Sequence, residues 1–224
     1  MEKEYIVIPA YNEEKTIGKV IDDLRKNKFK NIIIVDDGST DNTSEVVKSR
    51  KVRLYSHIIN RGLGGALNTG ISAALKNNAD IIATCDADGQ HDPKDVKKAI
   101  DFLKKEKLDV VIGSRIINSE GMPVSRKILN SGASFMTQLL FGVYSTDTQS
   151  GLRVFTKEAA EKIKIKTNRM EVSSEIIKEI GRNNLKFKEI PIKAIYTDYS
   201  LNKGQKGANA FNITYKLMLR KIMN

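Results

Sequence analysis

Short β-branched runs alternate in this sequence with stretches whose apolar residues recur at helical spacing, and few folds accommodate such an order. Strands are expected in the first half of the chain, at residues 5–9, 31–35, 52–55, 80–85 and 108–113. Helices are expected between them, over residues 13–26, 65–76 and 92–105, with a shorter one capped by Asp41 or Thr43. The alternation predicts an α/β, doubly wound, Rossmann-like fold with a mostly parallel sheet, which binds ligands beyond the carboxyl ends of its strands.

The order of elements changes after residue 119. We expect an amphipathic helix over residues 126–143, a strand over 151–155, a helix over 172–182, a strand over 187–195 and a terminal helix over 208–223. No internal repeat, low-complexity tract or long linker divides the 224 residues. The chain is therefore expected to form a single domain.

The rare reactive side chains are isolated from one another. Cys85 is the single cysteine, so a disulfide within the chain is excluded and a reducing compartment is the natural setting. It ends an apolar strand and is expected to be a small buried hydrophobe. His57 and His91 have no second His or Cys beside them, so we expect structural roles for both rather than metal ligation.

Positive charge is concentrated in the last third of the chain. The formal net charge is +11, and residues 1–150 carry 22 basic and 20 acidic side chains whereas residues 151–224 carry 16 and 7. This excess indicates an anionic partner such as phosphate or anionic lipid, or a solvated lysine-rich surface. Nucleic acid is not expected as a partner, because the acidic clusters of the first half would repel its phosphates.

The sequence DADGQ at residues 86–90 follows an expected strand. If the strand alternation continues, Asp86, Asp88 and Gln90 share one face. Their carboxylate and amide oxygens are ligands that suit Mg²⁺ or Mn²⁺. A metal there would neutralise charge on a departing phosphate, although a turn rich in Asp and Gly explains the same residues without a metal.

Three more polar clusters follow expected strands or helices. Asp36 or Asp37 would accept hydrogen bonds from a base or ribose, or would form an Asx turn and helix cap. The glycines of residues 60–65 would let backbone N–H groups approach phosphate, with Arg61 adding charge, or would form a flexible turn. Asp147 would act as a general base or orient an acceptor, or would belong to an ordinary polar loop.

In this order, the clusters resemble those of the inverting nucleotide-sugar glycosyltransferases of family 2, and most of all the polyprenyl-phosphate sugar synthases. The runs that carry the resemblance are IPAYNEE at 8–14, VDDGSTD at 35–41, NRGLGG at 60–65, DADGQHDP at 86–93, GSR at 113–115 and DTQSGLR at 147–153. The resemblance implies the nucleotide-diphospho-sugar transferase (GT-A) fold, a single domain with a mixed central sheet. It also implies a nucleotide-sugar-binding half, residues 1–118, and an acceptor-binding half, residues 119–224, with an amphipathic C-terminal helix.

Roles for individual residues follow from the resemblance by position. The nucleotide sugar would be bound by Pro9, Tyr11, Glu13, Asp36, Asp37, Gly64, Asp86, Ala87 and Asp88. The Mg²⁺ or Mn²⁺ ion would be held by Asp86, Asp88 and Gln90. The acceptor phosphate would be bound by Arg115, Arg126 and Lys206. The catalytic residues would be Asp88, Asp147 and Arg115.

The expected reaction moves a hexose or N-acetylhexosamine from a UDP- or GDP-sugar to a polyprenyl or dolichyl phosphate. Such an acceptor is already anionic, since its second pKa is near ~6, so residues that position it matter more than a strong base. One alternative is transfer to a sugar or protein hydroxyl with Asp147 as the base. A more distant alternative is a sugar-nucleotide nucleotidyltransferase, whose glycine- and lysine-rich phosphate loop is replaced here by Tyr11 and the residues that follow it.

The position relative to the membrane is also an expectation. No apolar run approaches the ~20 residues that span a bilayer, and the N-terminus does not resemble a signal peptide. Many relatives continue into transmembrane helices, whereas this chain stops after one short helix with an apolar stripe and a basic face. We therefore expect a cytoplasmic protein at the inner face of the membrane, held by peripheral contact or by a partner.

Overall fold

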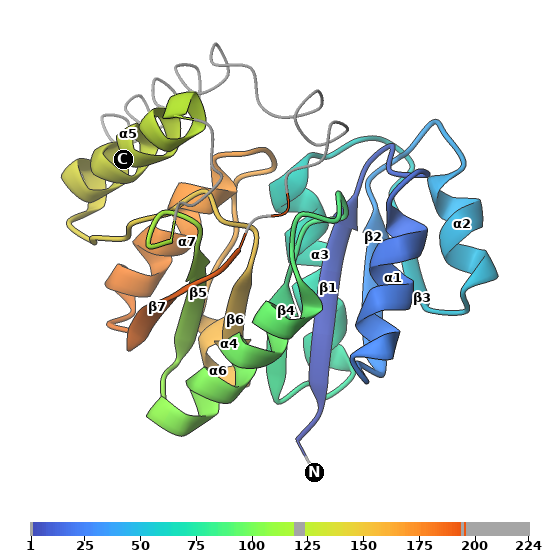
Figure 1. The fold of residues 1–224 in the computed structure, drawn as a ribbon, viewed down its shortest axis with the longest axis horizontal. Helices are drawn as coiled ribbons and strands as arrows, with labels where there is room; N and C mark the ends of the chain where they lie inside the picture. The colour runs from blue at the N-terminus through green and yellow to red at the C-terminus, as the bar shows by residue number, and fades with distance from the viewer. Residues whose placement is uncertain (1, 119–123, 194, 196–224) are drawn as a thin grey trace.

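A seven-stranded mixed sheet with the order β3-β2-β1-β4-β6-β5-β7 forms the centre of the molecule (Figure 1). The computed structural model describes residues 2–118, 124–193 and 195. The strands are β1 (Glu4–Ala10), β2 (Asn31–Asp36), β3 (Arg53–Ser56), β4 (Ile81–Thr84), β5 (Val110–Ser114), β6 (Arg153–Thr156) and β7 (Phe187–Pro191). Among the described strands, only β6 runs antiparallel to its neighbours, β4 and β5; every other adjacent pair is parallel. The expectation of an α/β fold with a mixed sheet is confirmed.

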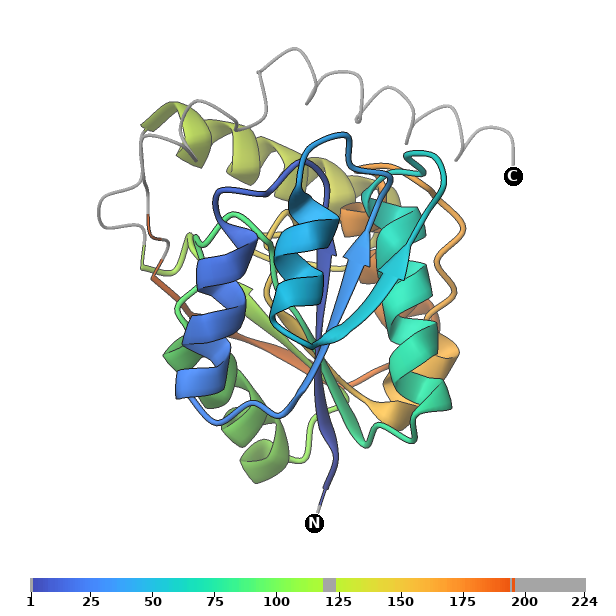
Figure 2. The ribbon, with the colours of Figure 1, turned by 90° about the vertical axis from the view of Figure 1, so that its right-hand side faces the viewer.

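Helices cover both faces of the sheet. They are α1 (Ile17–Lys26), α2 (Thr43–Ser49), α3 (Leu63–Lys76), α4 (Pro93–Glu106), α5 (Val124–Phe141), α6 (Lys157–Lys162) and α7 (Val172–Arg182). Alternate residues of β1 point to opposite sides: Ile6 and Ile8 pack with α1, α2 and α4, while Tyr5 and Val7 pack with α3, α6 and α7. Both faces are thus apolar and buried, which explains why the strand sequences are continuous apolar runs (Figure 2).

The carboxyl ends of the parallel strands bring the polar clusters together. β2, β1 and β4 are adjacent, so the residues that follow these three strands meet at one edge of the sheet. Because β6 runs in the opposite direction, its first residue, Arg153, lies at the same edge and brings residues 147–151 with it. α5 lies across this edge, above β5 and β7 (Figures 1 and 2).

Several boundaries differ from those expected. α1 begins at Ile17 rather than at residue 13, because the Glu13 carbonyl accepts the N–H groups of Thr16 and Ile17 in a turn. β7 ends at Pro191 rather than at residue 195. α6 was not expected; it starts where the Thr156 hydroxyl accepts the Ala159 N–H.

The amphipathic helix expected from residue 126 is α5, although it begins at Val124. The terminal helix expected over residues 208–223 lies outside the described residues. In the part of the chain that the structure describes, none of the helices is both long enough and apolar enough to cross a bilayer.

Candidate active site at the carboxyl edge of the sheet

The acidic cluster forms a turn rather than the end of a strand. β4 stops at Thr84, and the turn bends at Gly89, whose φ of +77° is open to glycine without strain. The Asp88 carboxylate accepts hydrogen bonds from the backbone N–H of Gln90 (3.0 Å) and from its side-chain amide (2.6 Å). Strand alternation is therefore not what brings these residues together: the turn itself places Asp88 against Gln90, and Asp86 is close to both in the sequence.

The two carboxylates of the turn differ in their surroundings. Asp86 Oδ2 lies 3.2 Å from His91 Nε2, and its side chain is 38% exposed. Burial disfavours the charged form of Asp86, but His91, with Arg115 and Arg153, outweighs it and holds the pKa of Asp86 below its ordinary value. Burial and the nearby charge of Asp86 raise the pKa of Asp88.

The residues of the turn fit a hard divalent cation. Two crowded carboxylates raise the free energy of each other's charged form, and a cation between them would relieve this repulsion. Carboxylate and amide oxygens are also the donors that Mg²⁺ and Mn²⁺ prefer. Among the described residues, however, no group of three His, Cys, Asp or Glu side chains is arranged to hold a metal ion. A protein-only metal cage is thus not formed there, and the oxygens of Asp86, Asp88 and Gln90 are the donors available.

Asp147 and Arg115 form a two-pronged ion pair beside the turn. Arg115 Nε donates to Asp147 Oδ2 (2.7 Å) and Arg115 Nη2 to Oδ1 (2.8 Å), while the Arg115 backbone N–H donates to Oδ2 (3.0 Å). Asp147 is fully buried, and the Arg115 side chain is 14% exposed. In this geometry the carboxylate orients the guanidinium at the end of β5.

The loop that carries Asp147 is held by Glu189 of β7, a residue that the sequence did not single out. The Glu189 carboxylate accepts hydrogen bonds from the Ser145 hydroxyl (2.7 Å), the Thr146 backbone N–H (3.0 Å) and the Thr146 hydroxyl (2.9 Å). The Thr146 hydroxyl also lies 2.7 Å from that of Ser114. The strand FKEIP carries two charged residues, Lys188 and Glu189, and its sequence does not distinguish the role of one from that of the other.

Arg153 supplies a buried positive charge between the two halves of the site. Its Nη2 donates to the Thr148 carbonyl (3.0 Å), and the side chain is among the most completely buried of the described residues. Burial lowers the pKa of Arg153 to about 10, with Asp86 and Asp147 acting in the opposite direction. The guanidinium therefore stays protonated at neutral pH, and Asp86 lies near a permanent cation.

Asp36 and Asp37 both hold loops at the ends of β2 and β3. Asp36 accepts the Ser39 N–H (3.0 Å) and the Ser44 hydroxyl. Asp37 accepts the N–H groups of residues 61 (2.9 Å) and 62 (2.7 Å) and contacts His57. Both carboxylates are buried, and the Asx turn of this segment is formed by Asp41, whose Oδ1 accepts the Thr43 N–H (3.0 Å).

The other residues expected at the site are placed as follows. Pro9 is in β1 and Ala87 is buried in the acidic turn, whereas Tyr11 is 43% exposed at the edge of the sheet. Glu13 is buried, and its Oε2 accepts the Thr16 hydroxyl (2.7 Å). Gly64 lies in the first turn of α3, where a Cβ would come within 1.9 Å of the Thr167 carbonyl oxygen. Arg126 lies in the first turn of α5, and Lys206 lies outside the described residues.

Residues 5–164 match the family model described as glycosyl transferase family 2. The chain belongs to this family. Its relatives include an uncharacterised protein of Methanocaldococcus jannaschii, 49% identical over 223 residues that cover 97% of this chain and 92% of that protein. The UDP-N-acetylglucosamine–dolichyl-phosphate N-acetylglucosaminyltransferase of Methanococcus voltae is 41% identical over 240 residues, which cover 97% and 96%. This family 2 member is thus a glycosyltransferase.

A solved structure with the same fold is the glucosyl-3-phosphoglycerate synthase of Mycobacterium tuberculosis in complex with Mn²⁺ and UDP-glucose. The TM-score is 0.74 with 19% sequence identity, and the match covers 97% of this chain and 77% of that one. The likeness confirms that the family 2 chain has the GT-A type of fold.

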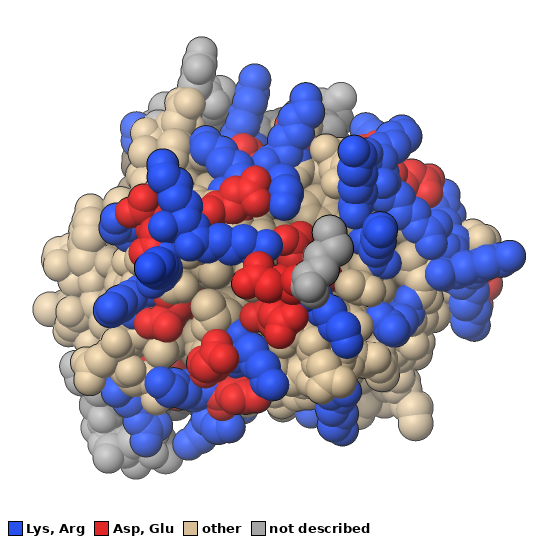
Figure 3. All heavy atoms as spheres, turned by 90° about the horizontal axis from the view of Figure 1, so that it is seen from below, with Lys and Arg blue, Asp and Glu red and all other residues tan. Residues whose placement is uncertain are grey.

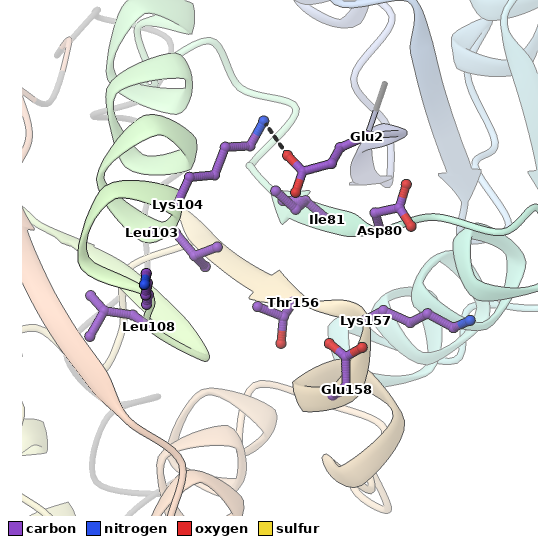
Figure 4. Close-up of a pocket in the computed structure, with 10 residues that line it drawn as sticks. Glu2, Asp80, Ile81, Leu103, Lys104, Leu108, Thr156, Lys157 and Glu158 are labelled. Atoms are coloured by element: carbon purple, nitrogen blue, oxygen red, sulfur yellow. Dashed lines mark ion pairs between the residues drawn. The ribbon is translucent and has the colours of Figure 1, made fainter.

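A separate hollow of about 550 Å³ lies at the opposite end of the sheet (Figure 4). Its lining includes Asp80, just before β4, and Thr156, at the end of the antiparallel strand β6, which places it at the amino ends of the parallel strands. Figure 3 shows this end, where acidic side chains gather with Lys and Arg around them. Lys104 in the lining already pairs with Glu2 (2.9 Å) and Glu4 (2.6 Å). The hollow is therefore distinct from the carboxyl-edge site of this glycosyltransferase.

Proposed function

We propose that this glycosyltransferase moves a sugar from a UDP-sugar or GDP-sugar to a polyprenyl phosphate of the dolichyl type. The observation that carries the proposal is that two features lie at the carboxyl edge of the sheet. One is the acidic turn of residues 86–90, which suits a cation, and the other is the buried pair of Asp147 and Arg115, which presents a guanidinium. The first suits the diphosphate of a donor, and the second suits an anionic acceptor. The name of the Methanococcus voltae relative supports UDP-N-acetylglucosamine and dolichyl phosphate as the pair to test first.

On the donor side, Asp86, Asp88 and Gln90 would hold Mg²⁺ or Mn²⁺. When bound, the ion would neutralise charge on the diphosphate leaving group. The opposing charges of the two carboxylates support this assignment. The glucosyl-3-phosphoglycerate synthase that shares the fold supports it as well, because its structure is a complex with Mn²⁺ and UDP-glucose. The nucleotide sugar would lie along residues that share the carboxyl edge of the sheet, namely Pro9, Tyr11, Glu13, Asp36, Asp37, Gly64 and Ala87.

On the acceptor side, Arg115 would bind the lipid phosphate, together with Arg126 and Lys206. A phosphate monoester is anionic without any base, since its second pKa is near ~6. Its oxygen needs a cation that positions it against the anomeric carbon, and the fixed guanidinium of Arg115 has that geometry. The main-chain N–H of Ile195 donates to the Gln90 carbonyl (3.0 Å), so the described end of the chain after β7 contacts the acidic turn.

The geometry favours a phosphate acceptor over a hydroxyl acceptor with Asp147 as base. A general base must reach the proton that it removes. Asp147 is instead buried, with both of its oxygens accepting hydrogen bonds from Arg115. In the proposed division of the chain, residues 1–118 bind the donor and residues 119–224 bind the acceptor within one domain, and Arg115, just before the boundary, contributes to the acceptor side.

α5 supports peripheral contact with the inner face of the membrane. Its buried side is polar: the Ser134 hydroxyl donates to the Thr146 carbonyl (3.1 Å), and the Thr137 hydroxyl lies 3.0 Å from that of Ser174. Its outer side is apolar, with Ile128 67%, Phe135 64% and Leu139 62% exposed. An apolar face turned outward beside the site suits a lipid interface, where a polyprenyl acceptor resides.

The proposal is tested by incubating the protein with radiolabelled UDP-N-acetylglucosamine, dolichyl phosphate and Mn²⁺, with UDP-glucose and GDP-mannose in parallel. We expect label in a chloroform-soluble product that mild acid releases, and none when the lipid carries a free hydroxyl in place of phosphate. Transfer to the free hydroxyl at an equal rate would overturn the phosphate-acceptor proposal.

A further inference from the structure

A continuous set of hydrogen bonds links the end of β2 to the first turns of α3 through His57. His57 Nδ1 lies 2.6 Å from Asp37 Oδ1, and His57 Nε2 lies 2.9 Å from the Thr69 hydroxyl. The Thr69 hydroxyl in turn donates to the Gly65 carbonyl (3.1 Å). The side chains of His57 and Asp37 are 9% and 4% exposed, so these bonds are shielded from competition by water.

Asp37 caps α3 from outside the helix. The residue at the N-cap position, Gly62, has no side chain to accept the first N–H groups, and the first turn of α3 contains no acidic residue. The Asp37 carboxylate accepts the N–H groups of Arg61 and Gly62 and places a negative charge at the positive end of the helix. The turn formed by residues 60–65 is thus fixed to the loop after β2.

The same turn is closed from the other side by residues 167–169. The Gly65 N–H donates to the Asn168 carbonyl (3.1 Å), and a Cβ at Gly62 would come within 2.5 Å of that carbonyl oxygen. Glu175 of α7 holds the segment, accepting the Thr167 N–H (2.9 Å) and hydroxyl (2.6 Å). One side of the turn is thus fixed by main-chain packing, and the other is fixed by Asp37, whose carboxylate is in turn contacted by His57.

We propose that His57 is a positioning residue of the donor site: its ring joins Asp37 to Thr69 and so sets the turn of residues 60–65 against the loop after β2. The inference rests on the proposed function, in which these two segments line the nucleotide sugar. His57 itself needs no contact with the donor, because it acts through Asp37 and the turn. Loss of the His57 ring is therefore expected to weaken donor binding and to change the rate of the chemical step little.

The test compares His57→Leu, Thr69→Val and the double variant by titration calorimetry with UDP-N-acetylglucosamine and Mn²⁺ and by steady-state kinetics. Each single variant should raise the donor Kd and KM about tenfold, the equivalent of one hydrogen bond to a charged group, with kcat within about twofold. Both variants break the same connection, so the double variant should bind no more weakly than His57→Leu. His57→Gln, whose amide reaches the Thr69 hydroxyl, should recover part of the affinity.

Thr156→Val provides the matched control, because it removes a helix-cap hydroxyl at the opposite end of the sheet. It should lower thermal stability and leave the donor KM unchanged. The inference is overturned if His57→Leu and Thr69→Val lower thermal stability as the control does but keep the wild-type donor Kd, or if their effects on Kd simply add. If the wild-type protein binds no nucleotide sugar at all, it is the proposed function that fails.

Discussion

Carboxylates at the carboxyl edge of the sheet fall into two groups according to what their oxygens contact. Asp37, Asp147 and Glu189 accept several hydrogen bonds from the protein itself, so each fixes a loop or a cation. Asp86 is paired on one side with His91 and is partly open to solvent. Asp88 is hydrogen-bonded to Gln90 within the same turn, and its charge and that of Asp86 oppose one another. The first group fixes the shape of the site, and the second, Asp86 and Asp88, is the group proposed to bind the cation that accompanies the donor.

Asp147→Asn tests the division at a single residue. The amide keeps the shape of the side chain but loses the charge that binds Arg115 in a two-pronged pair. We expect the acceptor KM to rise about tenfold or more, from loss of a charge-assisted hydrogen bond, with measurable turnover remaining. Kinetics over a range of acceptor concentrations measure this, and a large fall in kcat with unchanged acceptor KM would indicate a base instead.

At the level of secondary structure, two contacts between distant segments position the site. Glu189 of β7 holds the loop before β6, and the first turn of α3 packs against the segment before α7. Both contacts join segments that are far apart in the sequence. The local sequence around Glu189 or Gly64 therefore does not predict which residue it contacts. Substitutions at these contacts show how much each contributes to folding stability and how much to sugar transfer.

Glu189→Gln should loosen the loop that carries Asp147. The variant loses the charge that accepts the N–H and hydroxyl of Thr146, so we expect a loss of stability of about 1–3 kcal/mol and a lower kcat/KM for transfer. Urea unfolding and transfer assays measure the two effects. The matched control is Glu106→Gln, which removes an exposed ion pair with Lys188, the neighbour of Glu189 in β7. It should leave stability nearly unchanged. Equal effects of the two changes would contradict the role of Glu189.

Gly64→Ala should destabilise the protein by about 1–3 kcal/mol, because its Cβ would come within 1.9 Å of a main-chain oxygen that cannot move alone. Gly132→Ala in α5 is the control: nothing lies within 4 Å of its added Cβ, and alanine is favoured over glycine in a helix by about 1 kcal/mol. Thermal unfolding of both variants checks the contrast. A Gly64→Ala protein as stable as wild type would mean that the packing against residue 167 is looser than described.

The elements with local signals were predictable, and the contacts between them were not. The start of α4 follows from Asp92, whose side chain accepts the Lys94 N–H, and from Pro93 at the first helical position. The reversed direction of β6 depends on which strands flank it, which no local pattern records. Likewise, the acidic turn was evident from its residues, but Glu189 reaches Thr146 across 43 positions of the chain.

For the whole molecule, the position of α5 links the sheet edge to its surroundings. The helix lies at the edge of the sheet where the site is (Figure 1). It attaches to the body through buried hydroxyls and has large apolar side chains that are exposed. A soluble donor and a lipid acceptor could then meet at one edge. This arrangement would allow the proposed membrane contact, and none of the helices in the described residues is long and apolar enough to span a bilayer.

Phe135→Ser combined with Leu139→Ser should reduce binding to vesicles that contain anionic lipid, because each apolar side chain contributes about 1.5–3 kcal/mol when buried. Unfolding stability should stay close to that of wild type, since both side chains are exposed in the isolated protein. Sedimentation with vesicles and thermal unfolding measure the two properties. Undiminished vesicle binding would show that α5 is not the contact.

The most direct test of the account is donor binding to Asp88→Ala and to the wild-type protein, with and without Mn²⁺, followed by thermal unfolding. At 100 times its Kd, UDP-N-acetylglucosamine should stabilise the wild-type protein by ~2.7 kcal/mol only when Mn²⁺ is present, and the variant should show no such Mn²⁺-dependent gain. Sugar transfer should fall with it, by the equivalent of ~3–4 kcal/mol. An Asp88→Ala protein that binds the donor and transfers sugar as the wild type does would contradict the account.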